Sequence, residues 1–210
     1  MMKQPAKGIW VILIILLVLI LDQTLKIWIK THFYLGEEYK ITNWFIIKFV
    51  ENNGMAMGIE VIGKLFLSIF RIIATFAMAY YIYYLIQKKF NFGYIICIAL
   101  IFSGAVGNVI DSIFYGVFFS ESTSGNIAVL FPTDGGYGTW LHGKVVDMFY
   151  FPFFEFVWPS WIPFLGGTHF EFFRYIFNVA DAALSVGIIV LLLFYRNVFS
   201  KSFEKQEITV

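Results

Sequence analysis

Acidic and amide side chains recur at short spacings within apolar stretches of this sequence. Asp111 follows Asn108 by three positions, and Asp181 follows Asn178 by the same interval. Because residues three apart share one face of a helix, each Asn–Asp pair points in one direction. Asp147 stands alone between a β-branched run and an aromatic run. These acids are candidates for catalysis because an ionisable group is costly in apolar surroundings.

Two carboxylates that come close together can hydrolyse a peptide bond. Like charges in contact do not both ionise easily, so the pair holds one proton. The ionised carboxylate takes a proton from water, and the protonated one donates to the scissile carbonyl oxygen. This chemistry requires neither a metal ion nor a nucleotide, and no cofactor is expected.

The histidines and the cysteine give little support to metal or redox chemistry. Three histidines, His32, His142 and His169, lie outside the apolar segments and lack metal-ligand spacing. The single cysteine, Cys97, excludes an intrachain disulfide framework and a multi-cysteine metal cluster. We therefore predict no metal site.

Each polar residue also has a purely structural interpretation. Asn178 could cap a helix, and Asp181 in its first turn would favour the helix dipole. Asp147 alone would ordinarily be a solvated loop residue. Asp22 and Lys26, four positions apart, could simply form an ion pair at a helix end.

Two further groups of residues have alternative interpretations. Arg71 lies about two turns inside an apolar segment and could either snorkel to the membrane interface or pair with an acid. Gly104 and Gly107 would allow a neighbouring helix to approach closely. Helix packing accounts for these glycines but not for Asn108 and Asp111 beside them.

The elements that must position these residues are predicted to span a membrane. The chain is 60% hydrophobic and 21% aromatic but only 14% charged, whereas soluble domains carry about 25% charged residues. Much of the surface must therefore face lipid. A helix needs roughly 20 apolar residues to cross a bilayer core of about 30 Å. Four segments are long enough: about 8–28, 65–86, 94–114 and 177–195.

These segments predict an all-α polytopic membrane protein with one domain, residues 1–210. The first segment is expected to remain as a helix, because Asp22 and Lys26 stand where a small-residue cleavage site would be needed. Basic residues before the first segment, between the second and third, and after the fourth predict that both termini are cytoplasmic. A net charge of +1 argues against a nucleic-acid partner.

Two longer regions would then lie outside the membrane. Residues 29–64 are rich in β-branched and aromatic side chains and predict a small sheet. Residues 115–176 are crowded with Phe, Trp, Tyr, Gly and Pro, which favours interfacial loop segments. Both regions are expected to lie against the outer leaflet, and the acids should converge there at one membrane depth.

Five short motifs occur in order along these segments. They are Asp22-Gln23-Thr24-Leu25-Lys26, Asn52-Asn53-Gly54-Met55-Ala56-Met57-Gly58, Gly104-Ala105-Val106-Gly107-Asn108-Val109-Ile110-Asp111, Gly143-Lys144-Val145-Val146-Asp147 and Phe177-Asn178-Val179-Ala180-Asp181. Together they resemble the motifs of the lipoprotein signal peptidase (signal peptidase II) family. Each motif is short, but five in the right order make the resemblance specific.

The chain departs from the family's pattern in three places. Met57 replaces the usual Phe of the second motif, and Ser112 follows Asp111 where the family usually has Arg. An Asp–Arg pair is therefore not assumed, and another cation could serve. Residues 117–143 intervene before the fourth motif, which comes sooner in the family. This insertion could contact substrate or partners, or it could be a tolerated surface elaboration.

The resemblance implies a membrane aspartyl endopeptidase with Asp147 and Asp181 as its catalytic pair. Family members remove the signal peptides of bacterial prolipoproteins on the amino side of a diacylglyceryl-modified cysteine. The residues expected to support the site are Asp22, Lys26, Asn52, Gly54, Asn108, Asp111, Asn178 and Ala180. We expect a monomer among the lipids of the bacterial inner membrane, with its active site toward the outer face.

Three other functions fit the same acids less well. An ion-coupled transporter also places acids in a membrane, but these helices lack a carboxylate at the midplane. A metal-dependent lipid-modifying enzyme could use Asp111, Asp147 and Asp181 as oxygen ligands and would be sensitive to chelators. A non-catalytic assembly factor would tolerate Asn at the two acids.

Overall fold

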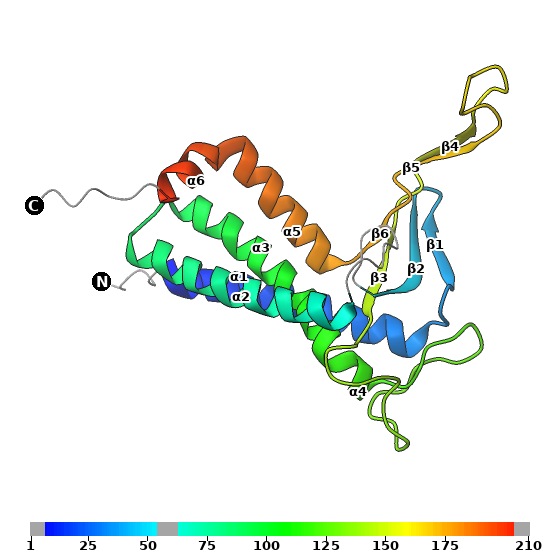
Figure 1. Cartoon of the computed structure of the whole chain (residues 1–210), viewed down its shortest axis with the longest axis horizontal. Helices are drawn as coiled ribbons and strands as arrows, with labels where there is room; N and C mark the ends of the chain where they lie inside the picture. The colour runs from blue at the N-terminus through cyan, green and yellow to red at the C-terminus, as the bar shows by residue number, and fades with distance from the viewer. Residues whose placement is uncertain (1–6, 54–62, 204–210) are drawn as a thin grey trace, which may run out of the picture.

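The chain forms a bundle of long helices with strands at one end. The computed structural model describes residues 7–53 and 63–203, and Figure 1 shows the sheet at one end of the helices. Within this part of the chain, four helices are long and apolar enough to cross a membrane. Their bounds are Lys7–His32, Lys64–Gln87, Phe92–Phe118 and Val179–Ser202. The four long apolar helices predicted from the sequence are therefore confirmed.

Two of the four helices contain a π-helical turn. The uninterrupted helices are α1 (Lys7–His32) and α2 (Lys64–Gln87). The third consists of α3 (Phe92–Ile110), the π-turn η2 (Asp111–Tyr115) and α4 (Gly116–Phe118). The fourth consists of α5 (Val179–Val190), the π-turn η3 (Leu191–Tyr195) and α6 (Arg196–Phe203). Such turns occur often at functional sites, and Asp111 lies in the first of them.

Several helix ends differ from the predicted ones: the third helix ends at Phe118 rather than about 114, and the fourth at Phe203 rather than about 195. α1 runs to His32 rather than ending near Trp28. α5 begins at Val179 instead of Phe177, because Phe177 belongs to a strand and Asn178 caps the helix. The hydrophobic pattern alone misses such ends, since strand pairing and capping decide them.

α3 lies at the centre of the bundle, where it packs against α1, α2 and α5. In the third helix, half of the residues of the most apolar segment are buried. In α1 and in the α5–α6 helix, only 11% of the residues of the corresponding segment are buried. The other helices expose large apolar side chains, such as Leu17, Ile73 and Leu193. This distribution suits helices that surround one buried helix and face lipid on their other sides.

Two glycines allow α5 to lie close against α3. A Cβ atom at Gly104 would collide with the carbonyl oxygen of Ala180 and lie 2.8 Å from Leu184 Cβ. A Cβ atom at Gly107 would lie 2.9 Å from Ala180 Cβ and 2.8 Å from Asp22 Oδ2. The close helix approach predicted from these small residues is therefore present, and it brings Asp22 of α1 next to the start of α5.

Gly104→Ala should destabilise the bundle by about 1–3 kcal/mol, because the added methyl group meets backbone that cannot move aside cheaply. The free energy of unfolding in mixed micelles would measure this effect. Gly8→Ala in α1 is the matched control, because a Cβ there meets nothing within 4 Å. Equal unfolding free energies for the two variants would contradict the close α3–α5 approach.

Strands from both outer regions form the sheet. Its antiparallel order is β1 (Glu38–Thr42), β2 (Phe45–Asn52), β3 (Val145–Tyr150) and β6 (Ile176–Phe177). A separate hairpin, β4 (Phe154–Val157) with β5 (His169–Phe172), projects from this sheet. The sheet predicted for residues 29–64 is confirmed. The prediction of loop segments for 115–176 is wrong in part, because strands β3 to β6 lie there, and "all-α" therefore describes only the membrane part.

The 117–143 insertion packs into an apolar core between α1 and the sheet. Phe119 and Ala128 of the insertion are buried together with Phe49 of β2 and Met148 of β3. The backbone N–H of Leu35 donates to Thr123 O at 3.1 Å. The insertion is therefore a packed part of the fold rather than a free surface loop.

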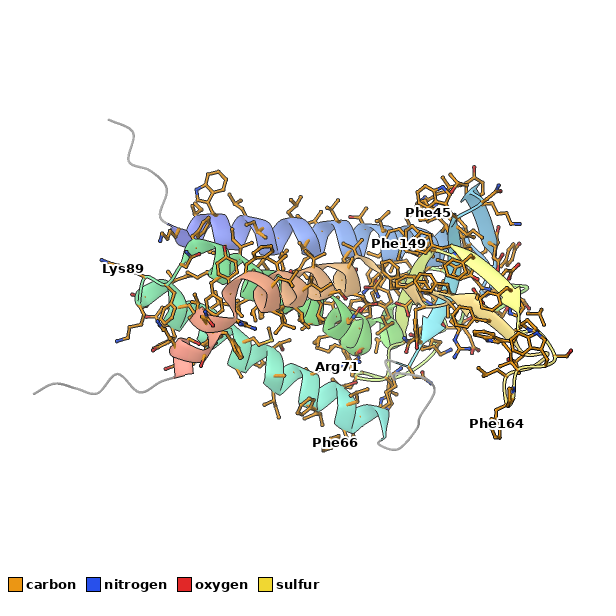
Figure 2. All side chains as sticks on the ribbon, turned by 90° about the horizontal axis from the view of Figure 1, so that it is seen from above. Phe45, Phe66, Arg71, Lys89, Phe149 and Phe164 are labelled. Carbon is orange, nitrogen blue, oxygen red and sulfur yellow. The ribbon has the colours of Figure 1, made fainter. Side chains whose placement is uncertain are left out.

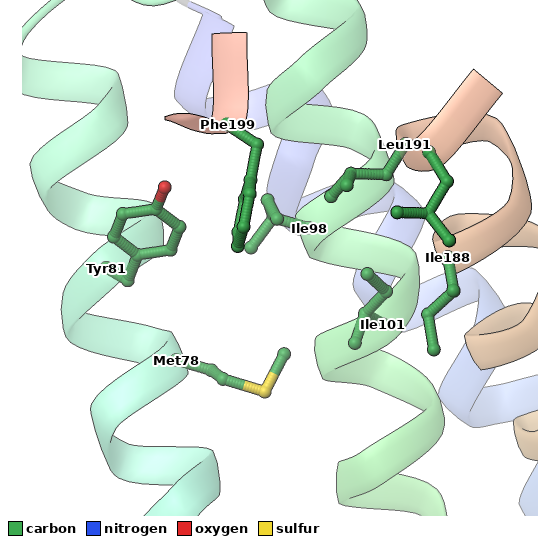
Figure 3. A pocket seen from close by; sticks show the side chains of 8 residues that line it. Met78, Tyr81, Ile98, Ile101, Ile188, Leu191 and Phe199 are labelled. Carbon is green, nitrogen blue, oxygen red and sulfur yellow. The ribbon is translucent and has the colours of Figure 1, made fainter. Parts of the chain in front are cut away.

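An apolar cavity of about 340 Å³ lies between α2, α3 and the α5–α6 helix. Figure 3 shows Met78 and Tyr81 of α2 facing Ile98 and Ile101 of α3 across it. The Tyr81 hydroxyl bonds to Tyr94 at 2.5 Å and to Ser202 at 2.6 Å. The Tyr81 hydroxyl already has these two partners, and the other lining residues are apolar. The cavity therefore offers no group for catalysis.

Candidate active site

The predicted site residues come together where α1, α3 and α5 meet β3. Asp147 lies in β3, Asp181 lies in the first turn of α5, and Asp111 begins the π-turn after α3. All the predicted site residues that the structure describes join one hydrogen-bonded network: Asp22, Lys26, Asn52, Asn108, Asp111, Asp147, Asn178, Ala180 and Asp181. Gly54 and Met57 lie outside the described residues.

Asp147 is buried and hydrogen-bonded at both carboxylate oxygens. Only 3% of the residue is exposed, in contrast to the solvated loop position considered from the sequence. Asn52 Nδ2 donates to Oδ2 at 3.0 Å, and Asn178 Nδ2 donates to Oδ1 at 2.7 Å. Burial raises the pKa of Asp147 to about 7, and the negative charge of Asp181 acts in the same direction.

Asp181 is held by the start of its own helix and by α3. Its Oδ2 accepts from the backbone N–H of Asn178 at 3.4 Å, while Asn178 Oδ1 accepts from the Asp181 N–H at 2.9 Å. This reciprocal pair is a capping box, so the predicted helix cap is confirmed. Asn108 Nδ2 donates to the other oxygen of Asp181 at 2.8 Å.

The Asn178 side chain links the Asp147 carboxylate to the backbone of Asp181. Its carbonyl end caps α5 at Asp181, and its amide end donates to Asp147 and, at 3.1 Å, to Asn108 Oδ1. The same residue therefore has the structural role considered from the sequence and also links β3 to α5. A cap residue with a second, non-local partner cannot be distinguished from an ordinary cap by its spacing alone.

Lys26 forms ion pairs with two further acids behind this pair. Its Nζ lies 2.9 Å from Asp22 Oδ2 and 2.9 Å from Asp111 Oδ2, and all three side chains are fully buried. Lys26 also donates to Asn108 Oδ1 at 2.9 Å. Asp22 Oδ1 accepts from the backbone N–H of Ala180 at 2.9 Å, which attaches α1 to α5. The predicted Asp22–Lys26 ion pair is present, but it is part of a larger cluster.

Arg71 of α2 interacts electrostatically with Asp181. The attraction acts between a cation of α2 and the acid at the start of α5. Figure 2 shows Arg71 on the α2 helix, within the bundle's sheet-side half.

The comparison with known proteins decides the family. A family model described as signal peptidase (SPase) II matches residues 14–196, which cover the helices and β3 that build the network. This chain is a member of the signal peptidase II family. The resemblance inferred from the five motifs is confirmed.

Similar sequences and similar solved structures both support the assignment to the signal peptidase II family. A lipoprotein signal peptidase of Porphyromonas gingivalis is 51% identical over 200 residues, covering 95% of this chain and 88% of the relative. One from Amoebophilus asiaticus is 32% identical over 203 residues, covering 93% and 81%. Two solved bacterial membrane enzymes superpose with TM-scores of 0.59 and 0.57 at 25% and 27% identity. The superpositions cover 95% and 87% of this chain, and 93% and 89% of the two solved chains, respectively.

The position that departs from the signal peptidase II pattern, Ser112, is accommodated without a cation of its own. Ser112 is buried and its Oγ donates to Asn108 O at 2.9 Å. Asp111, its neighbour, already has Lys26 as its cation and accepts from Val146 N–H at 3.2 Å. Lys26 is therefore the cation that pairs with Asp111, in place of the Arg that the family usually has after this Asp.

Two residues of the network were not assigned a role from the sequence. Gln23 donates to Asp111 Oδ1 at 2.9 Å and to Asp22 Oδ2 at 3.1 Å, and it accepts from the Tyr115 hydroxyl at 3.1 Å. Gln23 lies inside the first motif, between Asp22 and Lys26, and this position was the available signal. Tyr115 gave no such signal, because its partner is remote in the sequence.

An apolar groove of about 370 Å³ opens beside Asp181. Its walls are the exposed face of α5 and the aromatic segment that leads into it. The lining residues are Phe173, Tyr175, Phe177, Asp181, Ala182, Ser185, Val186 and Ile189. One of the two acids therefore borders a space suited to an apolar ligand.

The acids are arranged for hydrogen bonding with amides and a lysine. Within residues 7–53 and 63–203, no three His, Cys, Asp or Glu side chains are grouped to hold a metal ion. Asp111, which the metal-dependent alternative would need as a ligand, is bound to Lys26 and Gln23. Two of the partners of Asp111 are therefore donors, where a metal centre would need its carboxylate oxygens as ligands.

Proposed function

We propose that this signal peptidase II family member is an aspartyl endopeptidase that cleaves bacterial prolipoproteins. Cleavage would occur on the amino side of the diacylglyceryl-modified cysteine, with Asp147 and Asp181 as the catalytic pair. The observation that carries the proposal is that Asn178 donates to both carboxyl groups, from its side-chain amide to Asp147 and from its backbone N–H to Asp181. The relatives bear the name lipoprotein signal peptidase, which supports the substrate class.

The two carboxyl groups would supply both the base and the acid for hydrolysis. The ionised group takes a proton from water as the water oxygen attacks the scissile carbonyl carbon. The protonated group donates its proton to the carbonyl oxygen, giving a tetrahedral diol. When the C–N bond breaks, the protonated carboxyl group gives its proton to the leaving nitrogen. The ionised carboxylate takes the proton of one diol hydroxyl, which becomes the new carbonyl, and the pair again holds one proton. Because the pair titrates as a unit, no separate role is given to Asp147 or Asp181.

The amides around the pair would keep it in a reactive geometry. Asn52 and Asn178 fix Asp147, and Asn108 fixes Asp181. Donors that are already in place need no reorganisation as charge moves in the transition state. These three asparagines are therefore proposed to be positioning residues.

The same proposal includes a position in the membrane. The sheet would face the outer side of the bacterial inner membrane, with both termini in the cytoplasm and the enzyme acting as a monomer among lipids. Figure 2 shows Lys89, in the basic turn between α2 and α3, at the end of the bundle opposite Phe45 and Phe149 of the sheet. This separation supports the orientation, since basic turns favour the cytoplasmic side.

A cleavage assay with purified protein tests the proposal. We expect the protein to cut a diacylglyceryl-modified prolipoprotein before its cysteine, as read by mass spectrometry, with or without EDTA. Loss of activity in EDTA would support the metal-dependent alternative instead. Failure to cut the modified substrate would contradict the proposed function, and cleavage of an unmodified substrate at the same rate would contradict the requirement for the lipid.

The pH dependence of cleavage should follow the acid pair, in which burial raises the pKa of Asp147. Its raised pKa keeps the carboxyl protonated up to about pH 7, so the pair keeps its acid below this value and loses it above. We expect kcat/KM to decline on the alkaline side of about pH 7. A pH profile measured with a substrate that has no ionising group near the cleavage site would show this limb. Constant kcat/KM up to pH about 9 would contradict a mechanism that needs a protonated carboxyl group in the pair.

The groove beside Asp181 should bind the apolar part of the substrate. Ser185→Phe would fill the groove, and we expect KM to rise about ten-fold, corresponding to about 1.4 kcal/mol of binding. Leu193→Phe, on the exposed face of the same helix but outside the groove, is the matched control. An unchanged KM in Ser185→Phe would exclude the groove as a substrate site.

A further inference from the structure

A second group of buried charges lies beyond the acid pair. Lys30 of α1 is fully buried, and its Nζ contacts the carboxylate of Glu51 in β2. Ser122 of the insertion accepts from Lys30 Nζ at 2.8 Å and donates to Glu51 Oε1 at 3.0 Å. Glu51 Oε2 faces Lys144 Nζ at 3.3 Å. We refer to Lys30, Glu51, Ser122 and Lys144 as the Lys30 cluster.

Aromatic rings surround the cation of this cluster. Lys30 Nζ lies 4.9 Å from the ring centre of Tyr137, 5.4 Å from that of Phe119 and 6.0 Å from that of Phe49. Buried ammonium groups are strongly stabilised only where partners of this kind compensate for lost water. Because Lys30 and Glu51 are buried, removal of one partner should weaken the electrostatic stabilisation of the other.

The insertion supplies the parts that close the Lys30 cluster. Ser122, Phe119 and Tyr137 all belong to residues 117–143, and the Tyr137 hydroxyl accepts from the backbone N–H of Lys144 at 2.6 Å. Without the insertion, Lys30 would lose its hydroxyl partner and two of its three rings. The extra segment is therefore joined to α1 and β2 through charge as well as apolar packing.

The cluster is adjacent to a residue that holds Asp147. Glu51 precedes Asn52 in β2, and these two residues pair with Val146 and Val145 of β3. Successive residues of a strand point to opposite faces. Glu51 therefore faces the insertion while Asn52 faces the acids, where its Nδ2 lies 3.0 Å from Asp147 Oδ2. Fixing Glu51 on one face fixes Asn52 on the other.

We propose that the insertion and Lys30 position Asn52 against Asp147, which makes Lys30 and Ser122 positioning residues for catalysis. The inference rests on the proposed function, because it concerns the catalytic role of Asp147. It gives the 117–143 segment a role in catalysis, exerted through β2 and without contact with the substrate.

The alkaline limb of the kcat/KM profile can test this role. The Asn52 hydrogen bond lowers the pKa of Asp147, so Asn52→Leu should move the limb to higher pH by roughly 0.4–1 unit. Lys30→Met and Ser122→Ala should move it in the same direction by a smaller amount, because they displace Asn52 without removing it. Ser122→Ala leaves the net charge unchanged. If Lys30→Met fails to fold, the shift of the limb in Ser122→Ala tests the positioning role alone.

A double-mutant cycle separates positioning from a simple effect of charge. In an Asn52→Leu background, Lys30→Met and Ser122→Ala should cause no further shift, whereas the direct effect of a lost charge would persist. Lys48→Met, which breaks an exposed Lys–Glu pair on the same strand, should leave the limb in place.

Three results would overturn the inference. The first is an alkaline limb that does not move in Lys30→Met or Ser122→Ala. The second is a shift of equal size in the unmodified and the Asn52→Leu backgrounds. Either result would remove the positioning role and leave the proposed function intact. No shift in Asn52→Leu would mean that the limb does not report Asp147, and the catalytic assignment would then fall as well.

Discussion

Asp147→Asn and Asp181→Asn should each lower kcat for prolipoprotein cleavage by roughly a hundred- to ten-thousand-fold. An amide has nearly the shape of a carboxyl group but can neither take a proton from water nor hold the shared one. Because the two acids act as a unit, the double variant should be little worse than either single variant. Single-turnover cleavage assays at equal protein concentration would measure the loss.

The matched control for these variants is Asp134→Asn. Asp134 lies on the exposed surface of the insertion, and the same chemical change there should leave kcat unaltered. Elution as a single species and an unchanged unfolding midpoint would show that the variants fold. Activity within a few-fold of the unmodified protein in either dyad variant would remove that residue from the catalytic pair.

Lys26→Met should destabilise the protein by about 3–5 kcal/mol, the largest effect expected on folding. The substitution retains most of the side-chain length but leaves Asp22 and Asp111 facing each other without a cation. Both carboxylates are fully buried, so water cannot compensate for the loss. The free energy of unfolding in mixed micelles would measure the change.

Lys48→Met provides the control for the loss of a lysine. Lys48 pairs with Glu38 at 2.7 Å, but both side chains are about one-third exposed, and such surface pairs contribute about 0–1 kcal/mol. If Lys26→Met lowers the free energy of unfolding no more than Lys48→Met does, the stabilising role of the buried ion cluster that joins α1 to the π-turn is contradicted.

The long apolar helices and the two Asn–Asp pairs could be predicted because their signals are local or repeated. A run of about 20 apolar residues is sufficient to indicate a membrane helix. The Asn–Asp spacing of three placed Asn108 with Asp111 and Asn178 with Asp181 on common faces, and each pair does lie at the network. The family resemblance, rather than spacing, brought Asp147 into the site.

The strands after residue 115 could not be predicted in the same way. The aromatic residues of β4 and β5 pair with each other across a long connection, and β3 depends on β2 from the first outer region for its register. Pairing of this kind depends on non-local contacts, and side-chain type alone does not reveal it. The same runs of Phe and Tyr suit both a strand and an interfacial loop.

The buried ion clusters were also beyond the sequence signals. The pairing of Lys26 with Asp111 depends on the α1–α3 contact, and a spacing of four revealed only its pairing with Asp22. Lys30 is fully buried beside Glu51 although charged residues near helix ends are ordinarily solvated. Its partner Ser122 comes from the insertion, whose packing no local pattern indicated.

Infrared spectroscopy across neutral pH tests the shared-proton claim most directly. The carbonyl stretch of a protonated carboxylic acid should disappear with a midpoint near pH 7 in the unmodified protein. This component should be missing from the titration of Asp147→Asn, and it should shift to lower pH in Asp181→Asn, where the neighbouring negative charge is gone. An identical titration in Asp147→Asn and the unmodified protein would contradict the account, because the proton would then reside elsewhere.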